Sequence, residues 1–469
     1  MVVFVPDRFF DALIKPSCCY GTASMVWLFA AIKRHNCTMS NPKHSYPDSW
    51  YAASSRLLTA QSSALGDLSC DVCVVGGGYA GLSCALHLAK AGKSVVVLEA
   101  ERVGWGASGR NGGHVGTGQR ADQHSLEKWY GKATARELWR LGLEAVQLVT
   151  ELITENEIDC ELGKTNIHFA AKKSHVSELR DEIEHLRKQY DYDLITGVES
   201  SSLEELTSGV GFHYGVVDHG ARHLHPLKFC IGLAEAVIAA GASVFETSRV
   251  KDIAVRRDHA VVSTDKATIR AQKVVLACNG YLGDLFPPIA SNIMPINNFI
   301  VATEPLDEAT ASRINPLNAS LSDSLFVINY WKLSEDRRLI FGGGETYSDK
   351  FPESITDFVR PKLLAIYPEL ADTRLDFGWG GTLAITRNRM PDLGVHKGVV
   401  YYAQGFSGHG VPTATMAGKL IAAAIDCGND DFDLISGLKS LKFPGGPLLR
   451  RPSLVAGMLF YSLRDRLGR

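Results

Sequence analysis

The sequence has no excess of charge of either sign and no long apolar run. Its 49 Lys and Arg residues nearly balance 51 Asp and Glu residues, so the formal net charge is −2, and no basic stripe is present. This balance argues against a nucleic-acid partner. The stretch MVWLFAAI at residues 25–32 is apolar but far too short to span a bilayer.

Cysteine is sparse and irregularly spaced. The ten cysteines are scattered over 469 residues and do not form the dense, regular pattern of a secreted disulfide framework. We therefore expect reduced thiols and a cytoplasmic location. His219, His223 and His225 do not form a clean metal-ligand set, so we expect no metal.

The run from Asp71 to Ala100 is typical of a strand, a tight turn, a helix and a second strand. Gly76, Gly78 and Gly81 have the spacing of a dinucleotide-binding turn. The first glycine permits the turn, the second lets the backbone approach a pyrophosphate, and the third lets the helix pack on the sheet. Glu99 ends the second strand, where a carboxylate can accept hydrogen bonds from ribose hydroxyls. This pattern predicts FAD or NAD rather than NADP.

A second glycine-rich stretch, GWGASGRNGG at residues 104–113, follows directly. Its glycines allow backbone N–H groups to approach a flat ring system, which favours FAD over NAD. We expect Arg110 to neutralise a phosphate or a reduced, anionic flavin, and Asn111 to hydrogen-bond the ring edges. The alternative is a surface loop with a solvated arginine.

The rest of the chain indicates an α/β protein. Residues 125–210 have a mostly helical, charged pattern, and LFVINYWKLSEDRRLIFGGGETY predicts a hairpin within the strand-rich residues 290–350. We expect a discontinuous, Rossmann-like FAD-binding domain and a second α+β substrate domain on a mixed or antiparallel sheet. The expected ranges are 1–38 for an extension, 39–66 for a lead-in segment, 67–150, 212–285 and 376–430 for the FAD-binding domain, 151–211 and 286–375 for the substrate domain, and 431–469 for a C-terminal tail.

The block from Asp71 to Gly113 resembles the FAD-binding start of the D-amino-acid oxidase superfamily, which includes glycine oxidase and sarcosine oxidase. With TEPL (303–306), LIFGGGE (339–345), GGTLAITRNRMPDLG (380–394) and YYAQGFSGHGV (401–411), GWGASGRNGG most resembles the gamma-glutamylputrescine oxidase subgroup. The resemblance implies oxidation of a small primary or secondary amine by hydride transfer to FAD. The imine formed would hydrolyse to an aldehyde or ketone, with oxygen as acceptor and hydrogen peroxide as product.

The resemblance also implies which positions bind FAD. Val250 would offer its backbone to adenine, and the segment Gly405–Gly410 would aim a helix N-terminus at the pyrimidine edge of the flavin. The expected cofactor-binding residues are Gly76, Gly78, Tyr79, Ala80, Gly81, Glu99, Ala100, Gly106, Ala107, Ser108, Arg110, Asn111, Gly112, Gly113, Val250, Ala277, Gly280, Gly381, Gly405, Phe406, Ser407, Gly408, His409 and Gly410.

Two departures from the family pattern change the expectation. The block Gly381–Ala384 lacks the cysteine that carries covalent flavin in monomeric sarcosine oxidases, so we expect non-covalent FAD. The stretch MPINNFIV at residues 294–301 lacks the lysine that those oxidases place near the flavin for oxygen activation, so oxygen reactivity has another source or is weak. The alternative is a flavin dehydrogenase that passes electrons to a quinone or carrier, with LLRRPSLVAGMLFYSLRDRLGR touching a membrane surface. A non-catalytic FAD-binding module is a third reading.

The candidate catalytic residues are less firmly indicated. Tyr330 and Trp331 are expected to wall an aliphatic amine, although aromatic residues on a strand are also typical of a core. Glu345 follows three glycines and could hold an ammonium group or be a structural acid. His409 could contact the flavin ring or be a packed structural histidine.

Overall fold

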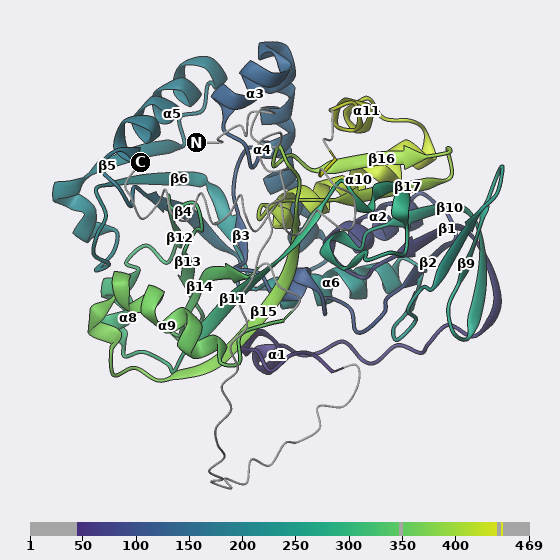
Figure 1. Cartoon of the computed structure of the whole chain (residues 1–469), viewed down its shortest axis with the longest axis horizontal. Coiled ribbons are helices and arrows are strands. Elements are labelled where there is room, and N and C mark those ends of the chain that lie inside the picture. Colours follow the sequence, from purple (N-terminus) through teal and green to yellow (C-terminus); the bar gives the residue numbers. More distant parts are fainter. Residues whose placement is uncertain (1–44, 347–349, 439–441, 444–469) are drawn as a thin grey trace, which may run out of the picture.

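The computed structural model describes residues 45–346, 350–438 and 442–443. The expected extension at residues 1–38 lies outside these ranges, and so do residues 439–441 and 444–469 of the expected C-terminal tail. Two β-sheets lie next to each other, with helices around them (Figure 1).

The first sheet carries the expected nucleotide-binding unit. Its main path runs β16–β17–β10–β1–β2–β7, and β9 and β8 extend from β10. The strands β17, β10, β1, β2 and β7 are parallel, whereas β16, β9 and β8 pair antiparallel. The bounds are β1 Gly66–Val75, β2 Val95–Leu98, β7 Ser243–Phe245, β8 Asp252–Val255, β9 Ala260–Ser263, β10 Ala267–Leu276, β16 Asp392–His396 and β17 Val400–Gln404.

The second sheet is mixed, as the sequence predicts. Its order is β15–β11–β14–β13–β12–β4–β6–β3, with β5 beside β6, and only β12 and β4 run parallel among its described pairs. The expected hairpin is β13 and β14. The bounds are β3 His114–Val115, β4 Gly163–Phe169, β5 Ile195–Glu199, β6 Tyr214–His223, β11 Met294–Thr303, β12 Ser320–Asp323, β13 Tyr330–Leu333, β14 Leu339–Thr346 and β15 Leu375–Ile385.

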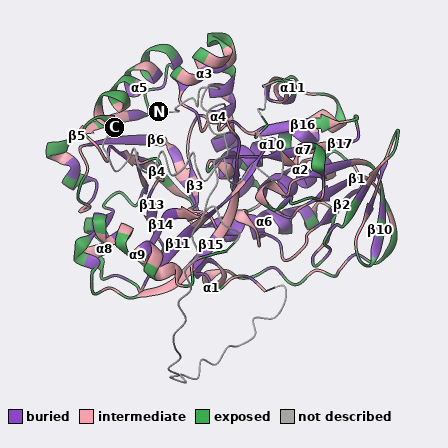
Figure 2. Ribbon diagram, viewed as in Figure 1, coloured by how far each residue is buried: buried purple, intermediate pink, exposed green. Residues whose placement is uncertain are grey.

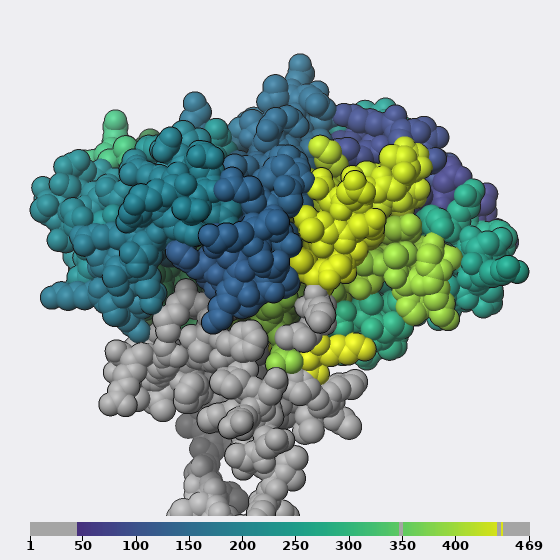
Figure 3. Space-filling view, turned by 90° about the horizontal axis from the view of Figure 1, so that it is seen from above, coloured from purple at the N-terminus to yellow at the C-terminus, as the bar shows by residue number. Residues whose placement is uncertain are grey.

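Helices from both ends of the described chain pack on each other. Ser83 Oγ on α2 donates to the Thr415 carbonyl on α10 at 2.7 Å. Gly418 is required there, because a Cβ at this position would lie 2.4 Å from the Ala80 carbonyl oxygen. In Figure 3 purple and yellow segments accordingly lie side by side. The α-helices are α1 Trp50–Ser54, α2 Tyr79–Lys90, α3 Gln123–Tyr130, α4 Lys132–Glu155, α5 His175–Tyr190, α6 Pro226–Ala239, α7 Pro287–Ala290, α8 Glu308–Ile314, α9 Ile355–Ile366, α10 Gly410–Asp426 and α11 Asp430–Ser436; the 3₁₀ turns are η2 Ala107–Gly109, η3 Ser200–Glu205, η4 Asn279–Tyr281 and η5 Pro368–Leu370.

The structure differs from the sequence-based expectation in two places. The strands β4 and β5 interrupt the region that we expected to be mostly helical, and alternating burial along β4 marks it as a sheet strand. The strands β6 and β15 pair within the second sheet, although their residues fall mainly in ranges assigned to the FAD-binding domain. Pairing depends on partners far away in sequence, which a local pattern does not reveal. The domain boundaries themselves stay a prediction.

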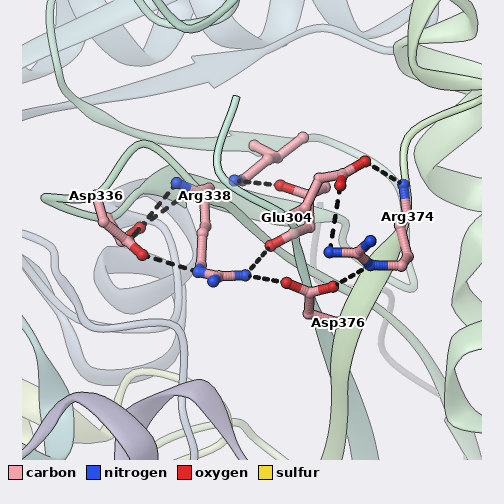
Figure 4. A network of polar contacts seen from close by, with 8 residues as sticks. Glu304, Asp336, Arg338, Arg374 and Asp376 are labelled. Carbon is pink, nitrogen blue, oxygen red and sulfur yellow. Dashed lines mark hydrogen bonds and ion pairs between the residues drawn. The ribbon is translucent and has the colours of Figure 1, made fainter. Parts of the chain in front are cut away.

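Both sheets have extensive buried faces (Figure 2). The far end of the second sheet is closed by a charged network (Figure 4). There Arg338, from the β13–β14 turn, donates to Asp376 at 2.6 Å, and Arg374 donates to the same carboxylate at 2.6 Å and approaches Glu304 at 3.3 Å. Within the described residues, none of the helices has the length and apolarity needed to cross a membrane.

Candidate cofactor and substrate site

The predicted cofactor residues follow the carboxyl ends of four parallel strands. Gly76 comes directly after β1, Glu99 after β2, Ala277 after β10 and Gly405 after β17. Because these strands are parallel neighbours, their carboxyl ends share one edge of the first sheet. Ligands of open α/β sheets bind at this edge. The fold therefore gathers segments that are separated by more than three hundred residues in the sequence.

The first glycine turn is closely packed. Gly76 has a φ of +113°, and a Cβ there would lie 2.8 Å from the Ala277 carbonyl oxygen. A Cβ on Gly81 would lie 2.0 Å from the carbonyl oxygen of Gly76. A Cβ on Gly78 would lie 2.7 Å from Ser108 Oγ, which accepts a hydrogen bond from the Tyr79 amide at 3.1 Å. Gly78 thus allows the second glycine-rich stretch to pack against the start of α2.

Glu99 holds this turn in place. Its carboxylate accepts hydrogen bonds from the Gly77 amide at 2.7 Å and from the Glu101 amide at 2.9 Å. Burial raises the pKa of the Glu99 carboxyl, and the two backbone hydrogen bonds oppose that rise. Because each carboxylate oxygen has a second lone pair, both can still accept from a ribose hydroxyl.

Arg110 is a buried arginine, only 8% exposed. Its Nε donates to the Trp105 carbonyl at 2.5 Å, its Nη1 donates to the Gly380 carbonyl at 3.0 Å, and the guanidinium lies 4.0 Å from the Trp105 ring centroid. Its Nη2 is buried and has no hydrogen-bond partner among the described residues. The alternative of a solvated arginine is therefore wrong. A buried cationic donor without an acceptor fits an anionic group such as a phosphate or a flavin carbonyl.

Asn111 has a different environment from the one that we expected. Its amide nitrogen donates to the carbonyls of Ala107 and Ser108 at 3.0 and 2.9 Å, and its oxygen accepts from the Gly113 amide at 2.8 Å. These contacts use the side chain to close its own loop. Contact with the ring edges therefore stays a prediction that none of these hydrogen bonds supports.

Gly112 and Gly113 allow the loop to pack closely against the second sheet. A Cβ on Gly112 would lie 2.6 Å from the Tyr330 ring. Gly113 has a φ of +74°, and a Cβ there would lie 2.0 Å from the Leu224 carbonyl oxygen. This close approach explains why glycine occupies both positions.

The segment Gly405–Gly410 leads into α10. Gly405 has a φ of +74°, and its amide donates to Asn279 Oδ1 at 2.9 Å. Neither α2 nor α10 begins with a side-chain cap from its N-cap residue, which is Gly78 in one helix and His409 in the other. Uncapped helix N-termini favour anionic groups.

His409 is a neutral imidazole with a buried, unpartnered nitrogen. Burial, followed by the charge of Arg120, lowers its pKa to about 4, while a backbone hydrogen bond with Gly118 opposes that shift. Its Nε2 is buried and has no hydrogen-bond partner among the described residues. In a neutral imidazole this nitrogen can accept a hydrogen bond or donate one, depending on the tautomer. Together with Arg110 Nη2, this open position fits a bound FAD.

The other expected cofactor residues lie around these elements. Val250 is buried in one hydrophobic cluster with Val75 and Leu98, and a Cβ on Gly381 would lie 3.1 Å from Arg110 Cβ. A Cβ on Gly280 would lie 2.9 Å from the Leu383 carbonyl oxygen. Ala80 is in the first turn of α2. Ala100 follows Glu99, and Gly106 and Ala107 lie at the start of η2. Phe406, Ser407 and Gly408 lie between β17 and α10, and Gly410 is the first residue of α10.

The structure places Tyr330 and Trp331, the two aromatic residues expected to line the amine site, in different environments. The Tyr330 ring packs against Gly112, and its hydroxyl donates to Asn298 Oδ1. Trp331 is 1% exposed and stacks at 5.8–6.2 Å among the rings of Phe169, Phe212 and Phe341. Successive residues of a strand point to opposite faces, so Trp331 belongs to the core and only Tyr330 reaches the loop.

The partly buried Glu345 follows Gly344 on β14 and interacts electrostatically with Tyr330. Burial, followed by the charge of Glu345, raises the pKa of the Tyr330 hydroxyl. Tyr330, Glu345 and the loop at Gly112 are thereby brought together. Their part in catalysis stays a prediction.

Sequence reasoning missed two basic residues. Arg120 donates through Nε to the Ser407 carbonyl at 3.2 Å, next to His409. Lys332 is 2% exposed and donates to the Leu224 carbonyl at 2.9 Å. A signal for Lys332 was present, because it is two residues after Tyr330 on the same strand and so shares its face.

Among the residues that the structure describes, no cluster of three or more His, Cys, Asp or Glu side chains could hold a metal ion. The described cysteines are free thiols. The donor groups that converge on the strand ends are instead backbone amides, Arg110 and two helix N-termini, which suit a phosphate-bearing organic cofactor.

Comparison with known proteins identifies the family of this chain. Residues 71–424 match the family model of FAD dependent oxidoreductases (DAO). The chain is 38% identical to gamma-glutamylputrescine oxidoreductase of Escherichia coli over 90% of this chain and 99% of that protein. It is 36% identical to a probable oxidoreductase of Rhizobium meliloti over 89% and 97% of the two chains.

Glycine oxidase from Geobacillus kaustophilus superimposes with a TM-score of 0.66 at 20% identity, covering 77% of this chain and 96% of that chain. L-proline dehydrogenase from P. horikoshii superimposes with a TM-score of 0.62 at 22% identity, covering 79% and 95%. At these identities the structures establish the shared fold, which is the predicted α/β class. The family model and the extent of the sequence match establish more: this chain belongs to the family of FAD dependent oxidoreductases.

Proposed function

We propose that this protein oxidises a small amine whose far end is an α-amino acid, with gamma-glutamylputrescine as the preferred substrate. The relative that carries this substrate in its name is matched along 99% of its length. FAD, when bound, supplies the acceptor for a hydride from the carbon next to the reacting nitrogen. The residues described above bind and orient that amine and keep water away.

The observation that carries the substrate assignment is the charge at Arg120. Burial, followed by the nearby charge of Arg389, lowers the pKa of Arg120 to about 10, and Glu345 opposes that shift. Arg120 is thus still protonated at neutral pH. None of the described ion pairs includes it. A partly buried guanidinium that has no ion pair among the described residues favours an anionic ligand group.

Gamma-glutamylputrescine has opposite charges at its glutamyl end. Its α-carboxylate is complementary to Arg120, and its α-ammonium group is complementary to Glu345. The free amine at its other end must be neutral to react, and a desolvated site lowers the pKa of an ammonium group. The buried His409 Nε2, which has no partner among the described residues, is available for a hydrogen bond with the amine or the cofactor.

We also propose that oxygen is the electron acceptor and that Lys332 supports this reaction. Burial lowers the pKa of Lys332 to about 8, with opposing contributions from Glu161 and Cys160. The ammonium form therefore still prevails at pH 7. A buried cation on the Tyr330 face favours the negative charge that develops on oxygen as it accepts electrons.

The substrate assignment is tested by anaerobic bleaching of the flavin absorbance. We expect gamma-glutamylputrescine to bleach the band faster at low concentration than putrescine, N-acetylputrescine, glycine or sarcosine. Arg120→Met should raise the KM for gamma-glutamylputrescine about tenfold to a hundredfold, because a charge-assisted bond is lost, and should leave putrescine nearly unaffected. Equal losses for both amines would contradict the assignment.

The acceptor is tested in air. We expect hydrogen peroxide in equimolar amount with the amine consumed. Lys332→Met should slow reoxidation by oxygen while leaving the anaerobic rate of bleaching near that of the parent protein. Reduced protein that persists in air but is reoxidised by a soluble quinone would instead support the dehydrogenase alternative. The C-terminal segment of that alternative lies outside the described residues, and a cytoplasmic location stays part of the proposal.

A further inference from the structure

Glu246 is a buried carboxylate that the cofactor motifs do not include. It is 1% exposed and follows the last residue of β7. Its Oε1 accepts from the Val103 amide at 2.8 Å, and its Oε2 accepts from Arg102 Nε at 2.8 Å and from the Gln61 amide at 2.9 Å. One side chain therefore joins the end of β7, the loop after β2 and the lead-in segment before β1.

Other bonds hold the same lead-in segment on the same loop. Arg102 also donates through Nη2 to the Leu58 carbonyl at 2.6 Å. The Tyr46 hydroxyl donates to the Val103 carbonyl at 2.7 Å, and Trp105 Nε1 donates to the Ser45 carbonyl at 3.0 Å. The lead-in segment is thus bound to residues 102–105 by hydrogen bonds from both side chains and backbone groups.

Residues 102–105 are joined to Arg110 through Trp105. Trp105 supplies both the carbonyl that accepts from Arg110 Nε and the ring that lies under the guanidinium. A shift of Trp105 would therefore move the cation whose Nη2 has no protein partner among the described residues. The path from Glu246 to Arg110 runs through Val103 and Trp105.

We propose that Glu246 is a positioning residue for the cofactor. Its hydrogen bonds join the lead-in segment to residues 102–105 and so hold Arg110 in the position in which it binds the anionic part of FAD. The proposal rests on the assignment of residues 104–113 to FAD and is independent of which amine is oxidised. A carboxylate is needed at this position because three donors, one of them charged, converge on it away from water.

The test measures the Kd of apoprotein for FAD by quenching of flavin fluorescence. Glu246→Gln keeps the shape but replaces one acceptor oxygen by a donor group, so we expect the Kd to rise about tenfold to a hundredfold. Glu235→Gln is the matched control. The ion pair of Glu235 with Arg56 also ties the lead-in segment to the body, but it is exposed and includes none of residues 102–105, so the Kd of this variant should stay within twofold of the parent value.

A double-mutant cycle separates positioning from general destabilisation. If Glu246 acts through Arg110, then Glu246→Gln should change the Kd by less than about threefold in an Arg110→Met background. A full additional effect in that background would overturn the proposal. So would a lowered melting temperature of Glu246→Gln apoprotein with an unchanged Kd.

A milder variant covers the case in which Glu246→Gln does not fold. Tyr46→Phe removes only the hydroxyl that donates to the Val103 carbonyl. We expect a severalfold rise in the Kd for FAD, again absent in the Arg110→Met background. An unchanged Kd for this variant would contradict the proposal that the lead-in segment positions residues 102–105. None of these readouts depends on amine turnover, so failure of the proposed function would be seen separately.

Discussion

At the scale of single residues, the environment decides what a side chain can do. Arg110 and Asn111 are adjacent, yet Arg110 has a buried nitrogen that lacks a partner among the described residues, whereas the Asn111 amide is hydrogen-bonded to its own loop. Tyr330 and Trp331 are adjacent too, and they face different neighbours. From residue type alone, both members of each pair would be expected to contact the cofactor or the substrate.

The first prediction concerns Arg110. Arg110→Met keeps an unbranched apolar stem and removes the cation, at a cost of roughly 1.5–3 kcal/mol in binding an anionic partner. The Kd for FAD should rise about tenfold to a hundredfold, as measured by titration of apoprotein. An unaltered Kd would show that the unpartnered nitrogen does not face the cofactor.

Gly112 gives a second prediction that depends on packing. Any Cβ there would lie 2.6 Å from the Tyr330 ring, so Gly112→Val must displace either the loop or the ring. We expect a lower flavin-to-protein absorbance ratio than for Gly112→Ala, and for both a lower ratio than for the parent. Gly92→Ala is a control for a destabilising change outside the site: its φ of +80° disfavours alanine, but a Cβ there meets nothing within 4 Å, so the flavin content should stay that of the parent. Full flavin content in the valine variant would refute this packing.

At the scale of elements, the second sheet is fastened at its far end by the network of Figure 4. Arg338, in the turn between β13 and β14, reaches Asp376 on β15. This contact ties the hairpin that carries Tyr330 to the edge strand of the sheet. The hairpin is therefore held both by its ladder bonds and by charge at its turn.

The network predicts a pH-dependent stability. Hydrogen bonding from Arg374, together with the charge of Arg338, holds the pKa of Asp376 below its usual range against the effect of burial. A carboxylate with a lowered folded-state pKa stabilises the protein above its unfolded pKa of about 3.9 and loses that contribution as the pH falls through the folded value. Asp376→Asn should cost about 1 kcal/mol at pH 7, and that difference should shrink below pH 4.

Urea unfolding of the variant and the parent at several pH values measures this difference. The exposed Asp372 is a matched control, and Asp372→Asn should change the unfolding free energy little at any of these pH values. A difference for Asp376→Asn that stays constant down to pH 3.5 would contradict the linkage.

At the scale of the whole molecule, the cofactor edge is built from segments near both ends of the described chain. The helices α2 and α10 must pack closely for the ends of β1 and β17 to meet the same ligand. Binding at such a junction stabilises the entire cooperative unit and not one segment of it.

This gives a prediction about loss of FAD. At free FAD a hundred times the Kd, the stabilisation is about 2.7 kcal/mol, so apoprotein should melt several degrees below holoprotein. Acid precipitation should leave the flavin in the supernatant, because Gly381–Ala384 contains no thiol. Flavin that stays with the pellet would overturn the non-covalent assignment.

A substitution at Gly418 tests the packing of α2 on α10 without removing FAD. Gly418→Ala brings a Cβ to 2.4 Å from the Ala80 carbonyl oxygen, and overpacking of this kind costs about 1–3 kcal/mol. We expect a lower melting temperature and weaker FAD binding, because α2 moves with its glycine turn. Lys419→Ala, on the exposed side of α10, should change neither.

The sequence by itself determined the nucleotide-binding turn, its acidic residue and the glycine-rich stretch after it. These features lie within about forty consecutive residues, and their spacing follows from local geometry of a strand, a turn and a helix. The β13–β14 hairpin was predictable for the same reason. Its two strands are separated by a short turn and need no distant partner to be recognised.

Only the tertiary structure decided which side chains meet across those elements. That Tyr330 rather than Trp331 faces the loop depends on the placement of β13 between β12 and β14. Arg120, Lys332 and Glu246 form hydrogen bonds with groups that are 108 to 287 residues away in the sequence, and no spacing in the sequence marks such contacts. Burial and pairing of charges are properties of the packed chain, because they depend on which distant surfaces exclude water together.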